Sequence, residues 1–98
     1  MARNVVGKKV EELREGRGWT QTQLVEELMA KTPGQKMNTM MATFNQLENS
    51  RRSMSAKYAI MLAKVFPEVT AKELLEMQLQ LDLTEAEEEL ALEATQAL

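Results

Sequence analysis

The stretch that decides the fold is MNTMMATFNQLENSRR, residues 37–52. Read at 3.6 residues per turn, it predicts a helix over about 36–48 whose two faces differ in chemistry. One face is apolar and can pack against a protein body, whereas the other is rich in amides and can meet a ligand. The apolar face carries Met37, Met40, Met41, Phe44 and Leu47, and the polar face carries Asn38, Ala42, Asn45, Gln46 and Asn49.

The polar face suits a groove of DNA. An Asn or Gln side chain presents a donor beside an acceptor, which matches the N6/N7 edge of adenine. We therefore expect Asn45 and Gln46 to contact bases, with Ala42 beside them. Arg51 and Arg52 follow the helix at once and can hold phosphates. Further phosphate contacts are expected at the two ends of the helix, from Lys36 and Asn49.

Glu48 departs from the pattern, because it lies close to Phe44 on the helical wheel and so points inward. A buried carboxylate needs a partner. In the segment 5–17, Val6, Val10 and Leu13 form an apolar stripe, and Arg14 lies on the same stripe. The sequence therefore predicts an Arg14–Glu48 ion pair inside the fold. The alternative is that both side chains reach solvent around the edge of the stripe.

The composition of the 98-residue chain indicates a single all-α domain. Eight Met and many Leu, Ala and Glu favour helix over strand, and only four residues are aromatic. The absence of Cys and His removes thiolate nucleophiles, the commonest metal ligands and the usual proton shuttle near neutral pH. The serines have no histidine base, and the four glycines are too scattered to cradle a phosphate. We expect no enzyme activity, no cofactor and no metal.

Charge divides the chain at Phe66. Residues 1–66 carry eleven Lys and Arg against six acids, a net charge of +5, and residues 67–98 carry one against nine, a net charge of −8. A basic body can attract phosphate while an acidic end stays in water or meets a basic partner. No apolar run approaches the ~18 residues of a membrane span, and the N-terminus lacks the apolar core of a secretion signal. We expect a soluble cytoplasmic protein with no membrane partner.

Glycine, proline and capping residues delimit the other helices. Gly16 and Gly18 stop a helix over 5–17, and Thr20 caps one over 21–30 that ends before Pro33-Gly34. Ser53 or Ser55 caps a helix over 56–66, which Pro67 stops, and Thr70 begins another. We expect five to six helices in all. They form a unit over residues 1–68 and an acidic helical extension over residues 69–98 that belongs to the same compact unit.

Leucines and other apolar residues alternate strictly with polar residues between positions 75 and 83. Alternation is typical of a strand, but Leu, Met, Gln and Glu are helix formers, so we favour a helix. So many apolar side chains need cover, and a homodimer contact is the economical explanation. The alternative is a segment that folds back on its own core. The residues of the predicted dimer contact are Leu75, Met77, Leu79, Leu81 and Leu83.

A last helix is predicted after this segment. Thr84 and Glu87 have the spacing of a capping box, and the carboxylates from Glu85 to Glu89 suit the positive end of a helix dipole. The apolar face of this helix is thin. The sequence is consistent with a solvated acidic tail or with a helix that docks on a basic protein.

Three segments resemble the lambda-repressor and Cro-like helix-turn-helix proteins, often called the XRE family. They are VEELR at 10–14, GWTQTQL at 18–24 and NQLENSRR at 45–52, and the resemblance covers residues 5–66. It implies that residues 1–68 form a helix-turn-helix DNA-binding domain, that Arg14 pairs with Glu48 and that Gln21 touches a phosphate. A helix N-terminus that points at phosphate makes physical sense for Gln21. The resemblance also implies base contacts in the major groove from Ala42, Thr43, Asn45 and Gln46.

The connection before the recognition helix departs from this family. A turn of about three or four residues joins helices 2 and 3 of a helix-turn-helix, whereas the stretch from Ala30 to Asn38 is longer. Either the third helix begins early and is longer than usual, or a loop bearing Lys31 and Lys36 bulges towards the nucleic-acid backbone. Both outcomes alter the angle of the helix in the groove, and hence which side chains reach bases.

The leading interpretation is a sequence-specific DNA-binding transcription regulator, a repressor. It acts on double-stranded DNA as a homodimer, because one recognition helix reads too few base pairs to be selective. The alternative is an antitoxin that binds a small basic toxin through its acidic C-terminal third and represses its own operon. The phrase SMSAKYAIMLAK, residues 53–64, is similar to the corresponding stretch of HigA-type antitoxins.

Overall fold

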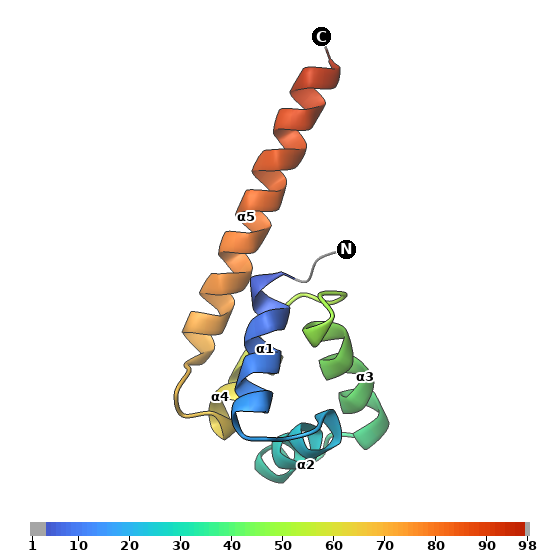
Figure 1. Cartoon of the computed structure of the whole chain (residues 1–98), viewed down its shortest axis with the longest axis vertical. Coiled ribbons are helices and arrows are strands. Elements are labelled where there is room, and N and C mark those ends of the chain that lie inside the picture. The colour runs from blue at the N-terminus through green and yellow to red at the C-terminus, as the bar shows by residue number, and fades with distance from the viewer. Residues whose placement is uncertain (1–3, 98) are drawn as a thin grey trace.

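Capping residues and glycines set where the helices begin and end. In the computed structural model, which describes residues 4–97, Asn4, Thr20, Ser55 and Thr70 each accept a hydrogen bond from the backbone N–H three residues on. Gly18 has φ 70°, a conformation that suits glycine just after a helix. The helices are α1 (Val5–Gly16), α2 (Gln21–Lys31), α3 (Met37–Glu48), α4 (Ala56–Val65) and α5 (Ala71–Gln96) (Figure 1).

The described residues contain these five helices and no strand, which confirms the predicted all-α class. The helices α1 to α4 form the body together with the first half of α5, and the rest of α5 leaves it as a long rod (Figure 1). The segment 75–83 is helical, as the helix-forming composition predicted. None of the helices in residues 4–97 is long and apolar enough to cross a membrane.

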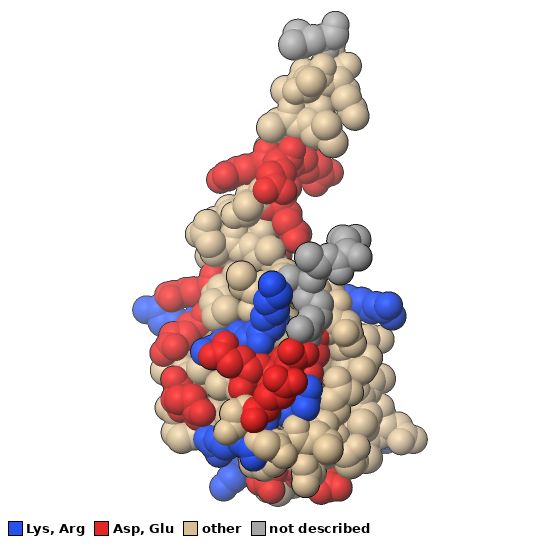
Figure 2. All heavy atoms as spheres, in the orientation of Figure 1, with Lys and Arg blue, Asp and Glu red and all other residues tan. Residues whose placement is uncertain are grey.

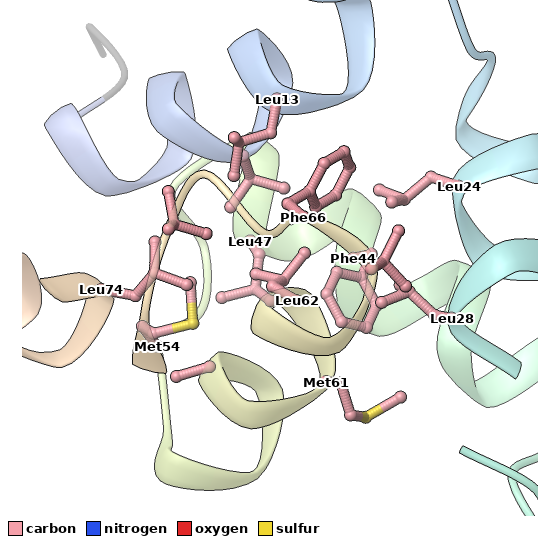
Figure 3. Packing of buried hydrophobic residues seen from close by; sticks show 14 of the residues in the cluster. Leu13, Leu24, Leu28, Phe44, Leu47, Met54, Met61, Leu62, Phe66 and Leu74 are labelled. Carbon is pink, nitrogen blue, oxygen red and sulfur yellow. The ribbon is translucent and has the colours of Figure 1, made fainter. Parts of the chain in front are cut away.

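Side chains from every helix meet in one apolar core (Figure 3). The apolar face of α3 enters it, because Met40, Phe44 and Leu47 are buried while Met37 and Met41 are half-buried against the same cluster. Burial of α3 on this side leaves its opposite face for solvent. Other members of the core are Val10 and Leu13 of α1, Leu24 and Leu28 of α2, Leu62 of α4, Phe66, and Leu74 of α5.

The connection between α2 and α3 is as long as the predicted helix ends allow, and it lies one residue further along the chain. It comprises residues 32–36, because α2 continues to Lys31 and α3 begins at Met37. Gly34 has φ 96° and makes the turn that follows Pro33. The alternative of a bulging loop that bears Lys31 and Lys36 is therefore wrong. Lys31 is the last residue of α2, and Lys36 is the residue immediately before α3.

The predicted start of a separate last helix at Thr84 is wrong, because α5 is continuous from Ala71 to Gln96. The Thr84 hydroxyl donates to the carbonyl oxygen of Gln80 at 3.0 Å, as hydroxyls inside helices do. The physical reason is that no Gly or Pro follows Pro67. Nothing in this span stops a helix made of strong helix formers.

The five alternating apolar residues do not share one face of α5, so they do not form a single apolar surface. Residues two apart lie on different sides of a helix, because each residue turns the helix by about 100°. Leu75, Met77 and Leu81 pack half-buried against the body, whereas Leu79 and Leu83 face solvent. The residues of α5 that are buried are Leu74 and Gln78, and Gln78 accepts a hydrogen bond from the Met54 N–H at 2.8 Å.

Only the first half of α5 belongs to the compact body. Every residue from 82 to 97 is exposed, and the molecule measures 54 × 25 × 24 Å. The expectation that residues 69–98 lie wholly within one compact unit is therefore corrected for this part. Figure 1 shows the C-terminal half of α5 extending beyond the other helices.

Candidate nucleic-acid interface

The solvent-facing side of α3 is a row of small and amide side chains. Asn38, Ala42, Asn45 and Asn49 are exposed and follow one another at intervals of four, three and four residues. This spacing places them on one stripe of the helix, opposite the face that enters the core. Gln46 lies beside the stripe and is half-buried. The structure therefore gathers three of the four residues predicted to contact bases.

Thr43, the fourth, is in the wrong place for a base contact. Its exposed fraction is 3 %, and it lies on the side of α3 that carries Met40 and Leu47. A side chain in the protein core cannot reach a base edge, so this prediction is wrong. The position came from the family resemblance, whereas the helical wheel of this sequence selected only the other three residues.

Two hydrogen bonds hold the amides of α3 in place. Asn45 Nδ2 donates to Gln21 Oε1 at 3.1 Å, which joins α3 to the first residue of α2. Gln46 Oε1 accepts from Arg52 Nε at 2.9 Å, which joins α3 to the turn that follows it. The predicted base-contacting and phosphate-contacting residues are thus bonded to one another in pairs.

The side chain of Asn49 bonds within α3 and not to another segment. Its Nδ2 donates to the carbonyl oxygen of Asn45 at 2.9 Å, so the side chain caps the end of α3. Asn49, Arg51 and Arg52 are nevertheless all exposed, as is Lys36 at the other end of the helix. Lys36 therefore lies before one end of the row of amides, and Arg51 and Arg52 follow its other end. Gln21, which is half-buried, lies beside Asn45.

The segment that contains α3 exposes basic side chains but no carboxylate. From residue 28 to residue 67 the only acid in the sequence is Glu48, and its exposed fraction is 2 %. Figure 2 shows carboxylates along the projecting part of the molecule, whereas the flank at the right, where Figure 1 places α3, is largely tan. A polyanion that approaches α3 meets no exposed acid from this segment. The cations of the same segment are Lys31, Lys36, Arg51, Arg52, Lys57 and Lys64.

Glu48 is neutralised by the ion pair that the sequence predicts. Arg14 Nε donates to the two carboxylate oxygens at 3.0 and 3.2 Å, and Nη2 donates to Oε1 at 3.0 Å. Arg14 Nη1 donates to the carbonyl oxygen of Trp19 at 2.7 Å. These hydrogen bonds to Glu48 raise the pKa of Arg14 above its ordinary value. The pair therefore joins α1, the turn before α2 and the end of α3.

The turn after α3 depends on two residues that the sequence analysis missed. Ser50 has φ 61°, and its Oγ accepts a hydrogen bond from the Asn4 N–H at 2.9 Å. Gly7 of α1 lets this turn approach closely, because a Cβ there would lie 2.6 Å from the carbonyl oxygen of Glu48 and 2.7 Å from Ser50 Oγ. A glycine inside a helix was the one available signal of this close approach.

Replacing Gly7 with alanine should lower the free energy of unfolding by about 1–3 kcal/mol, because the added methyl group meets backbone oxygens that cannot move independently. Gly16→Ala is the matched control within α1. Nothing lies within 4 Å of its Cβ position, and alanine there should stabilise the helix by about 0.5–1 kcal/mol. Urea denaturation of both variants measures the difference, and equal midpoints would contradict the close approach of α1 and α3.

Among residues 4–97, no group of three or more carboxylates is placed to hold a metal ion. Compared with protein-family models, curated proteins and solved structures, the chain has no significant match.

Proposed function

We propose that the protein is a DNA-binding transcription regulator, a repressor acting in the cytoplasm, that places α3 in the major groove. The observation that carries this proposal is the amide stripe of α3 within a segment, residues 28–67, whose single acid is buried and paired. Amides can read bases, and the exposed cations around them can neutralise phosphates.

The side chains would divide into two roles. Asn45 and Gln46 would read base edges, and the small side chain of Ala42 would let α3 approach closely and touch a thymine methyl group. Phosphate contacts fix the position of a protein on the duplex but carry no sequence information directly. The residues in this second role would be Gln21, Lys36, Asn49, Arg51 and Arg52.

Two copies would bind together. One recognition helix covers only a few base pairs, so selective binding needs two half-sites about one helical turn apart. Selection of bound duplexes from a random pool would reveal both the preferred sequence and the half-site spacing. Single half-sites among the selected duplexes would contradict the homodimer.

The double variant Arg51→Gln/Arg52→Gln tests the phosphate contacts. We expect at least about a tenfold loss of affinity for any duplex at low salt. The slope of log affinity against log salt should also become shallower by about 2, since each phosphate contact contributes about 0.9. Fluorescence anisotropy with a labelled duplex over a salt series measures both quantities.

The matched control is Lys8→Gln/Lys72→Gln, which removes the same charge from exposed positions in α1 and at the start of α5. Its affinity should fall less, through the long-range field alone. Equal losses in the two double variants would mean that net charge, and not the α3 surface, governs binding. If the wild type does not bind a duplex even at low salt, the proposed function itself fails.

A further inference from the structure

The C-terminal half of α5 is a helix without cover from the body. Residues 82–96 span about 22 Å at 1.5 Å per residue, and each of them is exposed. We call residues 79–97 the acidic arm. A lone helix of this length is marginal in water, and in proteins most helical stability comes from packing of an apolar face. The acidic arm has such a face, and no described residue outside α5 packs on its outer part.

The apolar face has the spacing of a coiled-coil seam. Leu79, Leu83, Ala86 and Leu90 follow at intervals of four, three and four residues, which are the d, a, d and a positions of a heptad repeat. The three leucines have exposed fractions of 57 %, 48 % and 64 %. Leu92, exposed at 59 %, lies on the opposite side of the helix and is not part of this seam.

Carboxylates occupy the positions beside the seam. With Leu83 at a, Asp82 and Glu89 fall at g and Glu87 falls at e, the positions whose charges choose the partner in a coiled coil. Glu93 falls at the next d position, within the seam itself. No Lys or Arg follows Lys72, so nothing on the acidic arm offsets these charges.

A second copy of the chain is a poor occupant for this seam. In a parallel pair Asp82 would face Glu87 of the other helix, and the two copies of Glu93 would meet in the same layer. In the antiparallel pair that places Leu79 opposite Leu90, Asp82 of each helix would face Glu89 of the other. Like charges at such positions oppose pairing, and they disfavour self-association while leaving a basic partner acceptable.

We propose that the acidic arm is a docking surface for a basic amphipathic helix of another protein. Apolar residues of that helix would pack between Leu79, Leu83 and Leu90, and its Lys or Arg residues would pair with the flanking carboxylates. A basic toxin, the partner of the alternative function considered from the sequence, is one kind of protein that fits this description. The surface is separate from α3 and does not rest on the DNA-binding proposal.

The test uses the full chain and a synthetic helical peptide of about three heptads, with Leu at a and d and Lys at e and g. Fluorescence anisotropy should detect 1:1 binding that weakens as salt rises. The same peptide with Glu at e and g should not bind. Binding of both peptides alike, or of neither, would overturn the proposal.

Variants of α5 locate the contact. Leu83→Gln/Leu90→Gln should weaken peptide binding about tenfold or more, whereas Leu92→Gln should change it less than about twofold. Glu87→Gln/Glu89→Gln should weaken it more than Glu85→Gln/Glu88→Gln, which removes equal charge from the side of the helix away from the seam. Equal effects within either comparison would mean non-specific attraction and would reject the docking surface.

Sedimentation of the protein without peptide tests whether a second copy of the chain occupies the seam. The oligomeric state should be the same for the wild type and for Leu83→Gln/Leu90→Gln, because a second copy does not use the seam. A wild-type dimer that these two substitutions dissociate would overturn the proposal. Circular dichroism of each variant should show wild-type helix content without peptide, so that altered binding reports the surface and not the fold.

Discussion

Replacing Glu48 with alanine should lower the free energy of unfolding by about 3–5 kcal/mol. Arg14 would then keep its charge in a site where its side chain is 13 % exposed, without the carboxylate that accepts three of its hydrogen bonds. The cost arises from the charge left without a partner, so the loss reflects more than the pair itself contributes. Urea denaturation followed by circular dichroism gives the midpoint and slope from which this free energy is obtained.

Two further variants separate this explanation from a general effect of charge. Arg14→Met/Glu48→Met removes both charges and should regain most of the lost stability, because buried ion pairs can often be replaced by apolar residues at little cost. Glu68→Ala breaks the exposed pair in which Arg17 Nη2 and Glu68 Oε1 lie 3.0 Å apart, and it should leave the midpoint nearly unchanged. If the double variant is less stable than Glu48→Ala, the unpaired charge is not the cause.

Most of the body was predictable because its signals are local. Caps, glycines and prolines fixed the helix ends within about a residue, and an inward carboxylate together with an arginine on an apolar stripe predicted the Arg14–Glu48 pair. A glycine inside a helix indicated a close approach at Gly7 but not its partner, because the contact joins segments more than forty residues apart. A serine with φ 61° at position 50 likewise gives no signal in a single sequence.

The errors on α5 have a common physical cause. The prediction from alternation assumes one shared surface, but a helix turns about 200° between residues two apart, so some face the body and others face solvent. Gln78 was missed as an inward residue because its reason for burial is a hydrogen bond to the backbone of Met54, 24 residues away. Thr84 had the local pattern of a cap, yet a helix already in progress satisfies the same backbone groups.

The sequence predicted which residues form the surface of the candidate site, but not the hydrogen bonds between them. The helical wheel selected Ala42, Asn45 and Gln46, whereas Thr43, which only the family resemblance offered, is buried. The bonds from Asn45 to Gln21 and from Gln46 to Arg52 depend on how α2 and the following turn lie beside α3. That arrangement depends on how separate helices pack together, which local sequence patterns do not reveal.

Replacing both Asn45 and Gln46 with alanine should reduce affinity for the selected duplex by about a hundredfold, while binding to a random duplex changes little. Each bidentate amide contact discriminates by about 1–3 kcal/mol, and every 1.4 kcal/mol is a factor of ten. Because phosphate contacts remain, the salt dependence should stay close to that of the wild type, the reverse of the expectation for the two arginines.

Gln46→Ala also releases Arg52 from its acceptor, so the effects of the single variants Asn45→Ala and Gln46→Ala on affinity should not add simply. Gln80→Ala removes an exposed amide from α5 and should leave both affinities unchanged. Equal loss on selected and random duplexes would show that these amides serve phosphate binding, and no loss on either would place base reading outside α3.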